Sequence, residues 1–62
     1  MSADEIAALA RAQEETHLAR LAVYETIADS VENSNHAAVV RAGLLHERTF
    51  ADFWREVAAT PP

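Results

Sequence analysis

Apolar residues in the first half of the chain recur at helical spacing. At about 100° per residue, one side of residues 3–31 collects apolar positions and the other collects charged ones. The apolar side contains Ile6, Leu9, Ala10, Gln13, His17, Leu21, Tyr24, Ile27, Ala28 and Val31. A Ser-x-x-Glu capping box, Ser2 with Glu5, precedes it. The pattern predicts an amphipathic helix from about residue 3 to about residue 31.

A second helical pattern follows the turn-like cluster SVENSN. Asparagine tolerates the left-handed conformation that ends helices, so the turn is expected at about residues 32–35. The second helix is predicted from about residue 36 to about residue 59, because the prolines at 61 and 62 cannot continue a helix interior. Its inward stripe is predicted to be His36, Val39, Val40, Gly43, Glu47, Phe50, Trp54 and Val57, with His46 and Phe53 at its flanks.

The predicted architecture is all-α, with residues 1–62 as one antiparallel two-helix hairpin. A chain of 62 residues buries only about 60% of the surface of its unfolded form, which leaves stability marginal. It has no cysteine, so disulfides cannot add to it. One hairpin cannot cover both apolar stripes. We therefore expect a homodimer that forms a four-helix bundle, or docking on a larger protein partner.

Composition excludes several function classes. A net charge of −5, with only five scattered arginines, disfavours nucleic acid and anionic membrane surfaces as partners. No apolar run approaches the roughly 18 residues of a membrane span, and the acidic N-terminal segment is unlike a signal peptide. A cytoplasmic location is expected. The sequence shows neither a glycine-rich phosphate loop nor a nucleophile beside a base, which argues against an enzyme.

Three polar residues on or beside the apolar stripes suggest a metal site. In a hairpin that turns near residues 33–34, residue 17 is level with about residue 50, so His17 and Glu47 can approach each other. Glu14 and His17 form a Glu-x-x-His pair on one helix surface, as in carboxylate-bridged metal bundles. Glu14, His17 and Glu47 from two copies would suit two ions of iron, manganese or zinc. Tyr24 could hydrogen-bond a ligand, and Gly43 would leave room for solvent.

Ordinary core contacts explain the same residues. A buried unpaired carboxylate is costly, so Glu47 needs a cation, a metal or a hydrogen-bond donor. Arg20, predicted on the facing helix at about the same level, could supply an ion pair. His17 could instead be a core histidine bonded to Tyr24 or to Glu47. The sequence leaves the metal site and the core contacts as alternatives.

The segments LARLAVYETIAD and AAVVRAGLLHERTFADFWREV resemble one half of a ferritin-like protein of the rubrerythrin group. The resemblance covers residues 13–57 and implies a four-helix bundle. Family halves carry Glu seven residues before a Tyr on the first helix, and Glu-x-x-His on the second. Tyr24 and Glu47 match this pattern, whereas His17 stands in the place of the first Glu and Phe50 in the place of the His. The resemblance implies either an altered metal site, with His17 and Glu14 as replacement ligands, or a bundle kept for assembly alone.

These observations favour a small non-enzymatic accessory or interaction module, a hairpin that homodimerises or docks on a larger protein. The alternative is a ferritin-like dinuclear metal protein, with iron oxidase or storage activity at the dimer interface. The two differ in whether Glu14, His17 and Glu47 bind metal.

Overall fold

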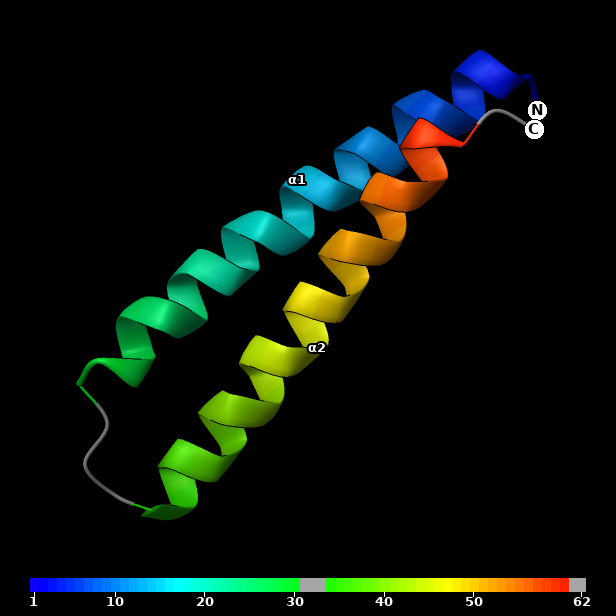
Figure 1. Cartoon of the computed structure of the whole chain (residues 1–62). Coiled ribbons are helices and arrows are strands. Elements are labelled where there is room, and N and C mark those ends of the chain that lie inside the picture. Colours follow the sequence, from blue (N-terminus) through cyan, green and yellow to red (C-terminus); the bar gives the residue numbers. More distant parts are fainter. Residues whose placement is uncertain (31–33, 61–62) are drawn as a thin grey trace.

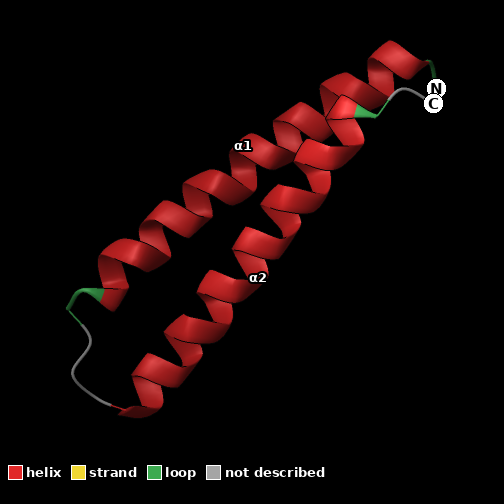
Figure 2. Ribbon diagram, in the orientation of Figure 1, coloured by secondary structure: helices red, strands yellow, loops and turns green. Residues whose placement is uncertain are grey.

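The computed structural model describes residues 1–30 and 34–60 as two helices, α1 (Ala3–Ala28) and α2 (Ser34–Ala59). The helices pack side by side and antiparallel, so the start of α1 and the end of α2 lie together at one end of a rod 46 Å long and about 15 Å across (Figure 1). Within the described residues there is no strand (Figure 2). The predicted all-α hairpin is confirmed. Neither helix is apolar enough over its length to span a membrane.

Helix α1 begins at the capping box that the sequence predicted. The Ser2 hydroxyl accepts a hydrogen bond from the Glu5 backbone N–H at 3.1 Å, and Glu5 Oε1 accepts one from the Ser2 backbone N–H at 3.0 Å. Two backbone donors that the first turn would leave without partners are therefore satisfied.

The capping box makes the stability of the N-terminus of α1 depend on pH. The Ser2 backbone N–H, and then the Ser2 hydroxyl, hold the pKa of Glu5 below its usual value of 4.5. A lowered carboxyl pKa contributes stability that is fully present above pH 4.5 and is lost as the pH falls through the folded-state value. We expect NMR to show the Ser2 amide losing exchange protection on acidification. Glu5→Gln should keep that protection in acid; a Glu5 that titrates at 4.5 would contradict the effect.

Helix α1 ends earlier than the sequence predicted. It stops at Ala28, where the Asp29 backbone N–H donates to the Glu25 carbonyl at 3.3 Å. The Ser30 backbone N–H and hydroxyl both donate to the Ile27 carbonyl at 3.0 Å, a local turn that competes with continuation of the helix. The predicted end at Val31, and residues 32 and 33 of the predicted turn, lie outside the described residues. Helix α2 begins at Ser34, two residues before its predicted start.

The helices meet along one stripe on each, which we call the seam. Its members recur at alternating steps of three and four residues, as in a coiled coil, and every one is buried or half-buried. On α1 they are Ala7, Ala10, Glu14, His17, Leu21, Tyr24 and Ala28. On α2 they are Ala37, Val40, Leu44, Glu47, Ala51, Trp54 and Ala58. Six of the fourteen are alanines, so small side chains make up much of the core.

A second pair of stripes lies beside the seam and forms the open face. It consists of Ile6, Leu9, Gln13, Thr16, Arg20, Val23 and Ile27 on α1, and of Val39, Gly43, His46, Phe50, Phe53 and Val57 on α2. Both stripes border the same side of the seam. Seam residues of α1 contact open-face residues of α2, as His17 does with Phe50 and Tyr24 with Gly43. Because the helices are antiparallel, the open-face stripe of α1 lies next to the seam of α2 on the same side of the hairpin. The two stripes therefore form one face.

The open face corrects the predicted core in several places. Leu9, Ile27, Val39 and Phe50 were predicted to point inward and are exposed, whereas Ala51 and Leu44 belong to the seam and were missed. The predicted stripes were centred on the widest apolar arc of each helix. Two helices alone bury only the narrower seam, so the rest of that arc stays uncovered.

Candidate functional site

A hydrogen bond between His17 and Glu47 joins the two helices at mid-length. His17 Nδ1 lies 2.5 Å from Glu47 Oε2, and the two residues are only 9% and 6% exposed. The predicted approach of these residues across the hairpin is confirmed. Within the described residues, no buried side-chain polar atom is without a hydrogen-bond partner, so this contact satisfies both groups in the core.

Two aromatic contacts extend this pair toward the open face. The ring of Phe50 stacks on His17 with centroids 5.2 Å apart, and the ring of His46 tilts against Phe50 at 4.6 Å. The contact of His17 with Phe50 matches the level predicted from the sequence. Phe50 nevertheless remains 39% exposed, so its ring covers the His17–Glu47 pair on the open-face side while its outer part faces solvent.

Glu14, the third predicted metal ligand, is half-buried in the seam one turn before His17. Among the described residues, no three His, Asp or Glu side chains come together as a group that could hold a metal ion. One hairpin therefore brings together His17 and Glu47 but does not add Glu14 to them. A three-ligand set would require side chains from another copy.

The ion pair between Arg20 and Glu47, one of the alternatives that the sequence left open, is not formed. Glu47 bonds to His17, whereas Arg20 is exposed on the open face and makes no ion pair within the described residues. Glu47 is a seam residue, and its nearest polar neighbour across the seam is another seam residue. Arg20 lies on the neighbouring stripe, and its long side chain reaches solvent.

Tyr24 fills the space that Gly43 was predicted to leave for solvent. A Cβ atom added at Gly43 would lie 2.5 Å from Cε1 and 2.6 Å from Cζ of the Tyr24 ring. The ring therefore lies directly on the backbone of α2, an approach that only glycine permits. Gly43 is explained as a packing residue. Within the described residues Tyr24 makes no side-chain hydrogen bond, so the predicted bond to His17 is also absent.

The Tyr24 contact makes the effect of Gly43→Ala depend on residue 24. With Tyr24 in place the ring must move, and the overpacking should outweigh the gain in helix propensity, leaving a net loss of about 1 kcal/mol. With Tyr24→Ala the same Gly43→Ala change should instead stabilise the chain by about 1 kcal/mol. Urea unfolding of the four proteins in this cycle measures both values. Equal effects in the two backgrounds would contradict the contact.

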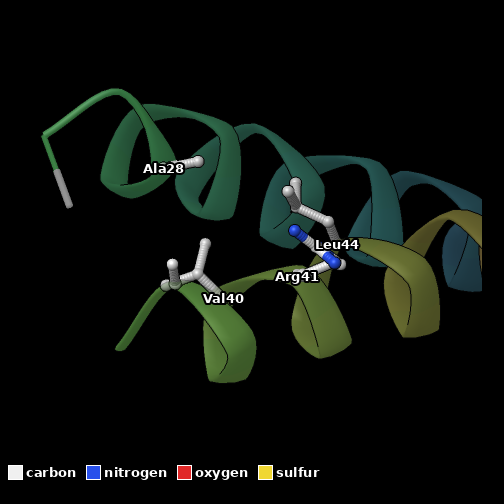
Figure 3. A pocket seen from close by; sticks show the side chains of 5 residues that line it. Ala28, Val40, Arg41 and Leu44 are labelled. Carbon is white, nitrogen blue, oxygen red and sulfur yellow. The ribbon is translucent and has the colours of Figure 1, made fainter. Parts of the chain in front are cut away.

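A cavity of about 160 Å³ lies near the turn end of the hairpin and is separate from the His17–Glu47 pair. Figure 3 shows Ala28 of α1 on one side, with Val40, Arg41 and Leu44 of α2 on the other. Its lining is apolar apart from Arg41. Two alanines of the seam, Ala28 and Ala37, border it, and their small side chains account for the gap.

Comparison of the chain with family models, with curated proteins and with solved structures gives no match. These comparisons do not bear on the ferritin-like resemblance, which rests on the residues quoted for it.

Proposed function

We propose that the chain is a small non-enzymatic interaction module that binds other helices through its open face. The observation that carries this proposal is the uncovered apolar surface beside the seam. Of the nine exposed large apolar residues described, six lie on the open face: Leu9, Val23, Ile27, Val39, Phe50 and Phe53. Exposed large apolar residues gathered on one face of a small chain are typical of a protein interaction site.

The weakness of the isolated hairpin supports this proposal. Among the described residues no large side chain is fully buried, and the buried apolar residues are Ala10, Leu21, Val40 and Ala51. A core of this size contributes little against the conformational entropy of two long helices. Burying the open face would add the large side chains that the seam lacks.

The charge distribution also favours docking at the open face. None of the described Asp and Glu residues lies on it, although the chain carries ten acidic residues, and Arg20 is its one arginine. Depletion of charged residues with enrichment of aromatic ones is the composition of an interface core. Phe50 and Phe53 are the aromatic members. The face is thus suited to an apolar helical partner, and a homodimer is the simplest assembly.

Thermal melting at about 1 µM and 100 µM chain, followed by circular dichroism, tests the proposed function. A melting temperature that rises with concentration supports docking between copies, because association stabilises the folded state by mass action. A chain that is unfolded at both concentrations supports docking on a larger protein. A well-folded monomer with the same melting temperature at both concentrations would refute the interaction module.

The second candidate function is dinuclear metal binding between two copies, with Glu14, His17 and Glu47 from each. The His17–Glu47 contact supports His17 as a ligand, because metal-bound histidines usually donate their other ring N–H to a carboxylate. Within one copy Glu47 then orients the ring, so as a ligand it would bind the ion held by His17 of the second copy. With Nδ1 on Glu47, the nitrogen left for a metal is Nε2 of His17. Elemental mass spectrometry of untagged protein should then find about one iron, manganese or zinc ion per chain, and Glu47→Gln should lose it. A metal-free dimer would reject this candidate.

A further inference from the structure

The open-face stripe of α1 has the same order of polar and apolar residues when read in either direction, and the stripe of α2 has the same spacing in either direction. Counting outward from Thr16 on α1, Gln13 matches Arg20 as a polar pair, and the apolar pairs are Leu9 with Val23 and Ile6 with Ile27. On α2 the positions are equally symmetric about residue 48. There the pairs are His46 with Phe50, Gly43 with Phe53, and Val39 with Val57.

The two centres of symmetry lie at one level of the hairpin. Contacts across the seam fix the register: His17 meets Glu47 and Phe50, and Tyr24 meets Gly43. Thr16 is therefore level with about residues 48–51 of α2. A single two-fold axis that lies across the open face at this level can place each stripe against the same stripe of a second copy.

We propose that the partner of the open face is a second copy of this chain, placed so that α1 lies antiparallel on α1 and α2 lies antiparallel on α2. This proposal rests on the proposed function and specifies the partner and its orientation. The axis crosses the bundle at Thr16 and between His46 and Phe50. The product is a four-helix bundle with closed two-fold symmetry.

Side-chain chemistry fits this orientation. Arg20, the one arginine of the face, lies opposite Gln13 of the second copy, whose amide oxygen can accept from the guanidinium. Thr16 at the axis already donates its hydroxyl to the Ala12 carbonyl at 3.0 Å, so it brings no unpaired donor to the interface.

The area of the face is also sufficient. A hairpin 46 Å long and 15 Å wide presents a footprint on the order of 700 Å² to its partner, close to the roughly 800 Å² per partner of a standard stable interface. The other two-fold arrangement would lay α1 on α2 of the second copy. That arrangement brings Arg20 level with His46 and leaves Gln13 among apolar residues, so it lacks the polar pairing.

Cysteine cross-linking distinguishes the two arrangements, because the chain has no natural cysteine. Thr16→Cys places a thiol at the proposed axis. Thr26→Cys is its matched control, since Thr26 is also exposed and bonds back to the Ala22 carbonyl at 3.0 Å, but it lies outside the open face. On oxidation with oxidised glutathione, we expect Thr16→Cys to form a disulfide-linked dimer and Thr26→Cys to remain unlinked.

Spin labels on Thr26→Cys provide a second readout that does not depend on substitution within the face. In the proposed dimer the two labels are offset by about 30 Å along the helix axis. In the other arrangement they sit at the same level, with no axial offset. A dimer with no cross-link at residue 16 and no axial offset at residue 26 would overturn the orientation and leave the interaction module standing. A well-folded monomer would overturn both.

Discussion

His17→Leu is expected to unfold most of the chain at room temperature, whereas the double variant His17→Leu/Glu47→Leu is expected to fold about as well as the wild type. Removing the histidine leaves the Glu47 carboxylate, 6% exposed, without its hydrogen-bond partner. Breaking one side of a buried pair in this way costs about 3–5 kcal/mol. A chain of this size has only roughly 3–9 kcal/mol of stability to lose.

The double variant recovers stability because it leaves no buried polar group behind. Replacing both members of a buried pair by apolar residues of similar volume is often neutral or stabilising. Glu47→Leu alone should fall between the two, since it leaves only a histidine nitrogen unsatisfied, at about 1–3 kcal/mol. Urea unfolding at one chain concentration gives all four values. A double variant as unstable as His17→Leu would contradict a purely structural pair.

Val39→Ser is expected to weaken assembly about 100-fold, whereas Leu45→Ser is expected to leave it unchanged. The two residues are matched, since Val39 is 69% and Leu45 is 68% exposed in the single hairpin. They differ in that Val39 belongs to the open face and Leu45 does not. In a symmetric dimer each substitution acts twice, so losing the burial of two valine side chains should cost about 3 kcal/mol.

Leu45→Ser is a stringent control for this comparison. Leucine is the better helix former, so Leu45→Ser removes more local helix stability than Val39→Ser does. If general helix weakening governed assembly, Leu45→Ser would show the larger effect. Dilution series by sedimentation velocity give the dissociation constants. Equal dissociation constants for the two variants would show that the open face is not the interface.

The periodicity of the sequence predicted the two helices and the antiparallel hairpin because each helix has a capping or breaking signal at its chain-terminal end. Ser2 with Glu5 marks one end, and the prolines at 61 and 62 follow the other. The approach of His17 to Glu47 was also predictable, since the position of the turn fixes which residues are level across a hairpin. The end of α1 was missed because hydrogen bonds from Ser30 to the Ile27 carbonyl stop the helix before its apolar pattern ends.

The division of each apolar arc into seam and open face could not be predicted from the sequence. Periodicity places Phe50 and Val39 on the apolar side of α2, but it does not indicate which part of that side meets α1. The choice depends on close packing between the helices, such as the Tyr24 ring lying on Gly43 and Ala51 lying in the seam. For the same reason the sequence does not distinguish Arg20, which lies on the neighbouring stripe, from His17 as the partner of Glu47.

Sedimentation equilibrium of the wild-type protein tests most directly whether the open face binds a second copy of the chain. We expect a mass of twice the 6.8 kDa of one chain at micromolar concentrations, with dissociation on dilution and when Val39 is replaced by serine. A folded species of 6.8 kDa that keeps this mass at the highest concentration reached would contradict it.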